Sequence, residues 1–410
     1  MNCRIATTVI ISALWLAWPC GGQQPAIEPQ AAIGLKTAWN QGYPLKGLRN
    51  ATALVASFKA KAKSLGKDGK LRILIIGDSL SDGNQHWSHY FRRNLQAAYG
   101  KGGYGAIWSG WAQYPQAIPG WLWDPKTDFT SSTKGLWRHS WGGRGDIWPY
   151  LGWNGDFLAT DLPAAEYQLT ARGSTFTVVY SSGTFTSFNG RSVMNRAAGF
   201  TVSLDGQSQV VPAASRGEPL DMGLLKLVTH DARHTLKIDH LHDGVLSLHG
   251  VLVENSAPGV VVYNISHGGW WAHSYLWRQP GWEKLLAACD PYVTIFFLSK
   301  PESGGSTEPS DTRLNPEYEM LVRRVLLAVP HTKLLFFNCW EPRDGISPAD
   351  AKTLAERVAW FEAHRYPYLD LQHGLNSGAM KELGWFQDNI HLAPPGGKGI
   401  GDAISQLFLP

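Results

Sequence analysis

The sequence has few charges and no concentrated patch of one sign. Only 17% of its 410 residues are charged, the formal net charge is +4, and no run of lysines and arginines stands out. Proteins that follow a phosphate backbone cluster such residues, so we expect no nucleic acid partner. No group of His, Cys, Asp and Glu has metal-ligand spacing, so we also expect no metal and no other cofactor.

Cysteine is scarce as well. There are four, and Cys3 and Cys20 lie in or beside an apolar N-terminal segment. Cys289 precedes one apparent strand and Cys339 follows another, so in a parallel sheet they would sit at opposite ends, separated by roughly five residues of about 3.3 Å each. A disulfide cannot span that distance. We expect two buried thiols that are not bonded to each other.

The N-terminus has the three parts of a secretory signal. A basic start is followed by an apolar stretch at 5–18, too short to span a bilayer comfortably, and then by small or polar residues. We therefore predict a signal peptide at 1–22, a secreted or periplasmic protein, and no integral membrane span after cleavage. Lipid attachment at Cys20 is an open alternative, although Trp18 and Pro19 are bulky or rigid where such sites usually carry small residues.

Most of the chain alternates strands with helices. With 44% hydrophobic residues it can bury a large core, and its length is typical of two or three domains. Three short apolar runs, mostly without polar alternation, indicate parallel strands buried on both faces, and they lie at 71–76, 293–298 and 333–338. A further apolar segment of the same pattern lies at 260–264. Helical patterns lie at 86–99, 282–288, 318–328 and 348–364. The pattern predicts an α/β domain.

The sequence pattern changes between about residues 162 and 255, where helical spacing is absent. Segments rich in β-branched residues, with turns at Asp205-Gly206 and Asp243-Gly244, lie at 176–180, 200–204, 224–228, 234–238 and 245–253. They predict an antiparallel β-sandwich inserted into the α/β domain. The predicted domains are therefore 23–135 and 258–410, which together form the α/β domain, and the insert at 136–257.

A serine stands at the junction of the first parallel strand and the next helix, in the stretch GDSLSDG at 77–83. That position exposes a side chain at the carboxyl edge of the sheet, close to backbone N–H groups and to the positive end of a helix dipole. A catalytic nucleophile requires these features. Near the other end of the chain, Asp388 precedes His391 by three residues, so one turn lets the carboxylate hold the imidazole while its other nitrogen faces Ser79.

These two motifs resemble the nucleophile block and the DxxH block of the SGNH/GDSL hydrolases. The resemblance covers roughly 40–135 and 258–410 and implies a three-layer, flavodoxin-like α/β/α domain with a parallel sheet. It also implies that Ser79 is the nucleophile, His391 the general base and Asp388 its orienting partner. Some bacterial carbohydrate O-acetylesterases of this family carry an inserted carbohydrate-binding-like β-sandwich, which the predicted insert resembles.

The middle blocks of the family match less closely. NISHGG at 264–269 resembles the block whose glycine joins the serine N–H in the oxyanion hole, a role that falls to Gly269, or to Gly268 as the alternative. The next block usually carries an asparagine as a third donor, but Pro301 stands at that position here. Proline has no N–H to donate, so three alternatives stay open. The oxyanion hole could have two backbone donors, another residue of the same loop could supply the third donor, or the site could bind its ligand without catalysis.

Tryptophan is abundant, with 19 in the chain. Flat rings stack on sugars but also pack domain junctions, and both readings apply to the cluster at Trp108, Trp111, Trp121, Trp123, Trp137, Trp141, Trp148 and Trp153. Trp270 and Trp271 follow the oxyanion glycines and, with His267, are the predicted substrate contacts.

Together these features predict a secreted serine esterase that removes acetyl or other short acyl groups from an oligosaccharide or polysaccharide. The alternatives are an O-acyltransferase with the same site and a polysaccharide-binding protein whose catalytic site has decayed. The polymer, the acyl group and the oligomeric state are not determined by the sequence.

Overall fold

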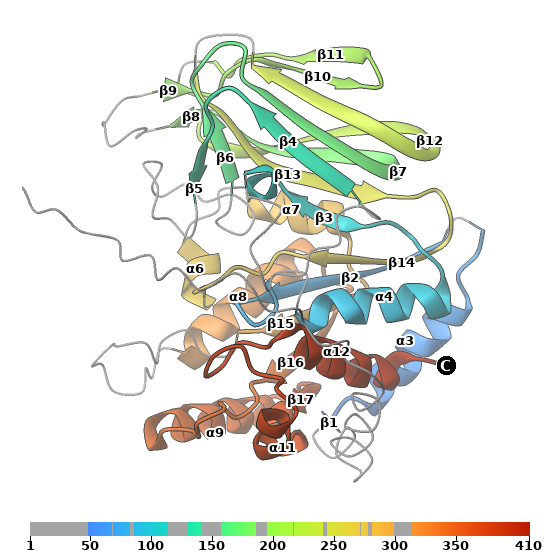
Figure 1. The fold of residues 1–410 in the computed structure, drawn as a ribbon, viewed down its shortest axis with the longest axis vertical. Coiled ribbons are helices and arrows are strands. Elements are labelled where there is room, and N and C mark those ends of the chain that lie inside the picture. The colour runs from blue at the N-terminus through green and yellow to red at the C-terminus, as the bar shows by residue number, and fades with distance from the viewer. Residues whose placement is uncertain are drawn as a thin grey trace, which may run out of the picture.

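The protein consists of a parallel sheet covered by helices and an antiparallel sheet stacked beside it (Figure 1). The computed structural model describes residues 48–67, 69–82, 86–113, 129–140, 157–185, 195–215, 217–240, 244–270, 272–277, 281–298 and 314–410. The predicted signal peptide, the Asp243 turn position and Pro301 lie outside these residues.

The parallel sheet contains the three predicted parallel strands and also the apolar segment at 260–264. Within the described residues its order is β1-β17-β16-β15-β2-β14, and only β1 runs antiparallel to its neighbour. The strands are β1 Leu48–Arg49, β2 Lys70–Gly77, β14 Gly259–Asn264, β15 Val293–Phe297, β16 Lys333–Asn338 and β17 Tyr368–Asp370. Because β2 and β14 are neighbours, the ends of these two strands bring residues 79 and 264–269 to one edge of the sheet.

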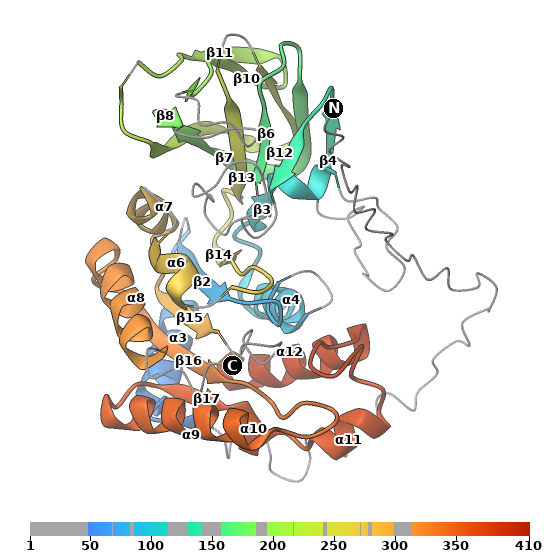
Figure 2. The ribbon, with the colours of Figure 1, turned by 90° about the vertical axis from the view of Figure 1, so that its left-hand side faces the viewer.

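Helices cover both faces of this sheet (Figure 2). Alternate residues of β2 enter different cores: Ile73 and Ile75 pack with α3, α4 and α12, whereas Leu74 and Ile76 pack with α6, α7, α8 and α9. This explains why the run from Ile73 to Ile76 is apolar, since both faces of that part of the strand are buried. The described helices are α3 Thr52–Lys63, α4 Trp87–Tyr99, η1 Ser109–Ala112, α6 Ala272–Trp277, α7 Trp282–Cys289, α8 Leu314–Ala328, α9 Pro348–Ala363, α10 Leu371–Gly374, α11 Ser377–Glu382 and α12 Pro394–Phe408.

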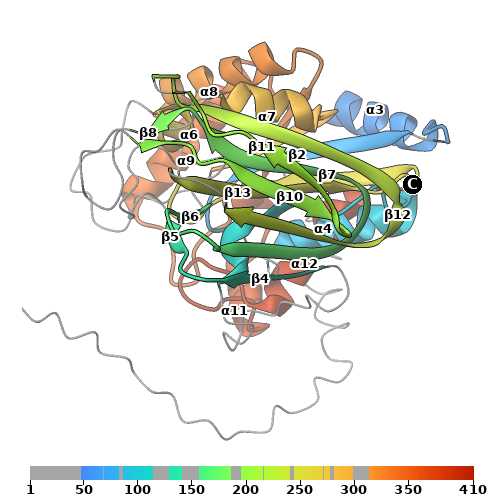
Figure 3. The same cartoon turned by 90° about the horizontal axis from the view of Figure 1, so that it is seen from above.

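The second sheet is antiparallel and is built around two long strands (Figures 1 and 3). β7 pairs along its length with β12, while its other edge pairs first with β4 and then with β13. The predicted Asp205-Gly206 turn joins β10 and β11, with positive φ at both residues. The strands are β3 Gly105–Trp108, β4 Phe129–Lys134, β5 Arg138–Ser140, β6 Phe157–Thr160, β7 Glu166–Ser182, β10 Phe200–Leu204, β11 Gln207–Val211, β12 Asp221–His240 and β13 Leu246–Glu254, with a separate pair formed by β8 Thr184–Phe185 and β9 Asn195–Arg196.

Two details of this sheet differ from the expectation. The segments at 224–228 and 234–238, predicted as separate strands, form the single strand β12, which stays paired with β7 across an irregularity between Val228 and Ala232. β3 and β4 precede the predicted boundary at residue 136, yet they pair with β13 and β7. The antiparallel sheet therefore takes residues from both sides of that boundary.

A partly buried ion pair ties the two sheets together at the strand that leads to Ser79. Arg72 of β2 donates to Glu254 at the end of β13 through Nε at 2.7 Å and Nη2 at 3.1 Å. The hydroxyl of Tyr263, on β14, also bonds to this carboxylate. Such a bidentate pair adds geometric specificity, so it fixes the direction of β2 relative to the second sheet. Cys289 and Cys339 are buried thiols and are not bonded to each other, as predicted.

Candidate active site

Ser79 lies in a tight loop between β2 and α4. Asp78, which is 2% exposed, shapes this loop: its Oδ1 accepts from Leu80 N at 2.9 Å, and its backbone oxygen accepts from the N–H groups of Ser81 and Asp82. Gly77 has to be glycine, because a Cβ there would come within 2.7 Å of the Ser266 hydroxyl oxygen. The loop leaves the Ser79 side chain partly exposed at the carboxyl edge of the sheet.

The structure brings Ser79, His391 and Asp388 together in one hydrogen-bonded chain. His391 Nε2 lies 2.8 Å from Ser79 Oγ, and His391 Nδ1 lies 2.7 Å from Asp388 Oδ2. Packing of α12 on α4 produces this meeting, since Ser79 comes just before α4 and His391 just before α12. The buried Trp340 helps to hold the loop that carries Asp388 and His391, because its ring N–H donates to Ile390 O at 3.0 Å.

The hydrogen bonds of Asp388 define the proton positions on His391. Burial opposes the charge on this carboxylate, but the N–H groups of His391 and Ile390 and the His391 ring outweigh it, so the pKa of Asp388 lies below its usual value. The ionised carboxylate only accepts, so Nδ1 of His391 carries the proton that it shares with Asp388. Nε2 is then the basic nitrogen, and it faces Ser79 Oγ.

The glycine loop after β14 lies against the serine loop. Gly268 N donates to Asp82 Oδ2 at 3.1 Å, so this amide already has a partner in the protein. Gly269 has φ +74°, is exposed, and has open space around its Cα. Of the two predicted alternatives, this arrangement favours the N–H of Gly269 as the partner of the Ser79 N–H in an oxyanion hole.

Two positioning residues were missed by the sequence reasoning. Asn264 joins the two loops: its Nδ2 donates to Ser81 O at 2.6 Å and to Ser88 Oγ at 3.1 Å, and its Oδ1 accepts from Ser266 N at 3.0 Å. The hydroxyl of Tyr275 lies 2.8 Å from Gly77 O and 2.9 Å from Ile265 O. The position of Asn264 at the end of the strand beside β2 was the available signal, whereas the contact of Tyr275 depends on the packing of α6.

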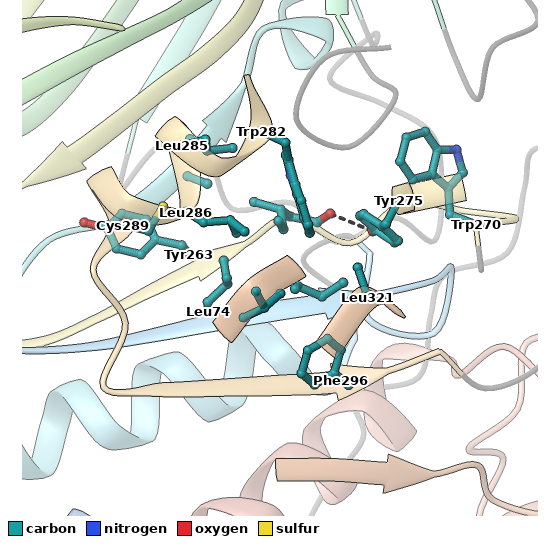
Figure 4. Packing of buried hydrophobic residues seen from close by; sticks show 14 of the residues in the cluster. Leu74, Tyr263, Trp270, Tyr275, Trp282, Leu285, Leu286, Cys289, Phe296 and Leu321 are labelled. Atoms are coloured by element: carbon teal, nitrogen blue, oxygen red, sulfur yellow. Dashed lines mark hydrogen bonds between the residues drawn. The ribbon is translucent and has the colours of Figure 1, made fainter. Parts of the chain in front are cut away.

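The predicted substrate contacts are placed differently from the expectation. His267 is 0% and Trp270 3% exposed, and the Trp270 ring packs against Tyr275 at 4.8 Å between centroids (Figure 4). A sugar cannot stack on a ring that protein atoms already cover, so we do not propose these two side chains as substrate contacts. Trp271 lies outside the described residues.

In the described ranges there is no group of three or more His, Cys, Asp and Glu side chains that could hold a metal ion. Across the same residues, no helix is both long enough and apolar enough to cross a membrane.

Solved structures with a similar fold are known. One is a peptidoglycan O-acetylesterase that is 15% identical, with a TM-score of 0.63 over 87% of this chain and 94% of that chain. The chain shares the fold of that esterase. The predicted resemblance to the SGNH/GDSL carbohydrate esterases is therefore confirmed at the level of the fold.

Two carbohydrate esterases are more distant in structure. A family two carbohydrate esterase from Cellvibrio japonicus is 10% identical and has a TM-score of 0.23 over 67% of this chain and 99% of that one. A family two enzyme from Clostridium thermocellum in complex with cellohexaose is 12% identical, with a TM-score of 0.28 over 66% and 97%. At these scores neither carries an argument about function. No family model and no curated protein sequence matches the chain.

Proposed function

We propose that this protein is a serine carboxylic ester hydrolase that removes acetyl or other short acyl groups from a carbohydrate. The observation that carries the proposal is the chain of contacts from Ser79 through His391 to Asp388, with distances of 2.8 and 2.7 Å. All three groups are in place and connected, which argues against the alternative of a decayed site that only binds.

The reaction follows from the proton positions. Ser79 Oγ attacks the ester carbonyl as its proton passes to Nε2 of His391, and the ionised Asp388 stabilises the imidazolium that forms. The N–H groups of Ser79 and Gly269 donate to the oxyanion. Collapse of the intermediate breaks the bond to the sugar oxygen, which takes the proton from Nε2 and leaves. Water then attacks the acyl-enzyme with the same base and releases the free acid.

The proposed carbohydrate substrate is supported by the fold. The described neighbour with the same overall fold is named as a peptidoglycan O-acetylesterase. Trp108 and Trp111, from the tryptophan-rich segment, pack edge to face with ring centroids 5.4 Å apart, and Trp108 is 5% exposed, so these two rings fit domain packing rather than sugar stacking. We further propose that the antiparallel sheet forms an inserted carbohydrate-binding-like module and that the protein is exported, as its N-terminal residues predict.

The proposal is tested by acetate release from a panel of acetylated glycans, peptidoglycan included, with and without an added sugar acceptor. We expect release that Ser79→Ala and His391→Ala abolish and that a chelator does not affect. Transfer of the acetyl group to the acceptor in preference to water would favour the acyltransferase alternative. No release and no transfer with any glycan or small acetate ester would overturn the proposal.

The chain offers a matched control for the histidine. His373 bonds through Nδ1 to Asp370 Oδ2 at 2.6 Å with the same three-residue spacing, and Asp370 ends β17 of the same sheet. His373→Ala removes an equivalent Asp–His pair that does not contact Ser79. We expect this variant to keep wild-type activity.

A further inference from the structure

The two glycines after β14 form the centre of a β-turn. Trp270 N donates to His267 O at 3.2 Å, which closes the turn around Gly268 and Gly269. Gly269, in the third position, has φ +74°, as in a type II turn, whereas a type I turn has φ of about −90° there. The middle peptide of the turn, between the two glycines, is turned over from one type to the other. The turn type therefore decides where the N–H of Gly269 points.

This turn lies across the loop that carries Ser79. His267 N donates to Gly77 O at 3.1 Å, and Gly268 N donates to Asp82 Oδ2 at 3.1 Å. Gly77 comes before Ser79 in the chain and Asp82 after it, so the turn is tied to the nucleophile loop on both sides of the serine. The orientation of the middle peptide therefore matters to an oxyanion that forms at Ser79.

The side chain of His267 holds this middle peptide. Its Nδ1 lies 2.7 Å from Gly268 O. A carbonyl oxygen only accepts, so Nδ1 carries a hydrogen and donates it. In a trans peptide the C=O and the N–H point to opposite sides, so the bond that holds Gly268 O toward the imidazole turns the N–H of Gly269 away from it.

The imidazole is itself fixed in the interior. His267 is 0% exposed, and its ring contacts the rings of Trp108 and Trp270, with 6.5 and 5.3 Å between centroids. Gly269, by contrast, is exposed. The Gly268 carbonyl is therefore held toward a buried ring, while the N–H of Gly269 points to the accessible side of the turn.

We propose that His267 is a positioning residue for the oxyanion hole: its Nδ1–H holds the Gly268 carbonyl and so keeps the N–H of Gly269 directed at the oxyanion. The inference rests on the proposed esterase function and adds a residue to it. The imidazole acts here neither as a base nor as a substrate contact. A middle peptide that is turned over would present the Gly268 carbonyl oxygen to the oxyanion, and the two oxygens would repel each other.

Two substitutions at His267 separate this role from packing. Asparagine Nδ2 lies close to the position of histidine Nδ1 and can donate to Gly268 O, whereas leucine fills the buried space without a donor. We expect His267→Leu to lower kcat on a small chromogenic acetate ester about 10- to 100-fold with little change in KM, and His267→Asn to keep kcat within about threefold of wild type. If the imidazole only filled space, the apolar leucine would be the better tolerated of the two.

A thiono ester reports on the oxyanion hole itself. Sulfur accepts hydrogen bonds weakly, so a substrate with sulfur in place of the carbonyl oxygen gains little from the N–H of Gly269. The ratio of kcat/KM for the acetate ester to kcat/KM for its thionoacetate should be roughly tenfold lower in His267→Leu than in the wild type, and unchanged in His267→Asn. General damage to the fold would slow both substrates alike, so an unchanged ratio in His267→Leu would contradict the proposal.

A backbone variant covers the case in which the His267 variants do not fold. Gly269→Ala puts a Cβ into open space, so it acts through the positive φ, which side chains disfavour, and it favours a middle peptide that is turned over. We expect a lower kcat and the same lower ratio. The matched control is Gly206→Ala, which also puts a Cβ into open space, at φ +86° in the turn between β10 and β11, and should leave both quantities unchanged. A wild-type ratio in Gly269→Ala would count against the proposal.

Crystal structures of the variants make the inference independent of the esterase proposal. We expect the middle peptide to be turned over in His267→Leu and to keep its orientation in His267→Asn. A wild-type protein that hydrolyses no ester would contradict the esterase function alone, and the peptide orientation in His267→Leu would still decide whether His267 holds it. Esterase activity in the wild type, together with an unchanged peptide, kcat and ratio in His267→Leu, would overturn the positioning role alone.

Discussion

Replacing Asp388 by asparagine separates the orienting role of this residue from its role in the loop. Asp388 Oδ1 accepts from the N–H groups of Ile390 and His391 at 2.9 and 2.8 Å, and an asparagine oxygen can keep both bonds. Oδ2, which accepts from His391 Nδ1 at 2.7 Å, would become an NH₂ group. That group donates, so it favours the tautomer of His391 with hydrogen on Nε2, which cannot take a proton from Ser79.

The size of the effect follows from these bonds. The lost charge-assisted hydrogen bond contributes about 1.5–3 kcal/mol, which corresponds to a rate factor of roughly 10–150. The wrong tautomer adds to this, and the same change in a serine protease triad costs about 10,000-fold in kcat. We therefore expect Asp388→Asn to lower kcat on the order of 1,000- to 10,000-fold with little change in KM.

The assay is steady-state hydrolysis of a chromogenic acetate ester, with circular dichroism and thermal unfolding as checks on the fold. Asp388→Ala is the companion variant. It also lowers kcat, but it leaves the imidazole able to adopt either tautomer, so we expect it to be milder than Ser79→Ala. Activity of Asp388→Asn within tenfold of wild type, with an unchanged fold, would refute the tautomer argument.

Three further changes test the loops and the buried histidines. Gly77→Ala places a Cβ 2.7 Å from the Ser266 hydroxyl oxygen, so it should lower kcat and reduce the free energy of unfolding, measured in urea, by about 1–3 kcal/mol. A variant as stable as the wild type would show that the two loops adjust freely. Asn264→Asp removes the donor to Ser81 O and should lower kcat on the order of 100-fold through a displaced serine, and an unchanged kcat would contradict its positioning role. His249 bonds to Ser181, and burial lowers the pKa of its imidazole to about 3. Between pH 6.5, near the pKa of a histidine in the unfolded chain, and pH 3, the unfolded chain binds a proton at this position that the folded protein does not. The free energy of unfolding therefore decreases as the pH is lowered through this range, by up to about 1.4 kcal/mol per pH unit. His249→Asn should flatten this pH dependence in urea unfolding, and an identical slope would contradict it.

The sequence was informative where local chemistry decides the structure. The runs that became β2 and β16 are apolar on both faces because both faces are buried, so their pattern is visible without the fold. Ser79 and the Asp388–His391 pair were also predictable, since each depends on a short motif at the end of an element. The meeting of the two motifs was predicted from their residue types, the resemblance supported it, and the packing of α4 on α12 supplies its physical basis.

The sequence was less informative where distant packing decides. The sequence pattern predicted two strands where β12 is one, because the pattern carries no information on pairing. In the structure, β7 pairs with β12 on both sides of the irregularity. Trp270 is a residue type that often contacts sugars, but in the structure its ring is buried against Tyr275 of α6. Asn264 has no distinguishing motif of its own, and its role depends on loops that are far apart in sequence.

The most direct test of the central claim is labelling of the wild-type protein with a serine-directed phosphonate, followed by peptide mapping by mass spectrometry. Because Ser79 Oγ lies 2.8 Å from the basic nitrogen of His391, it should be the activated hydroxyl of the chain. We predict a single adduct on Ser79, loss of esterase activity in proportion to labelling, and much slower labelling in His391→Ala. An adduct on another residue, or full activity in the labelled protein, would contradict the account.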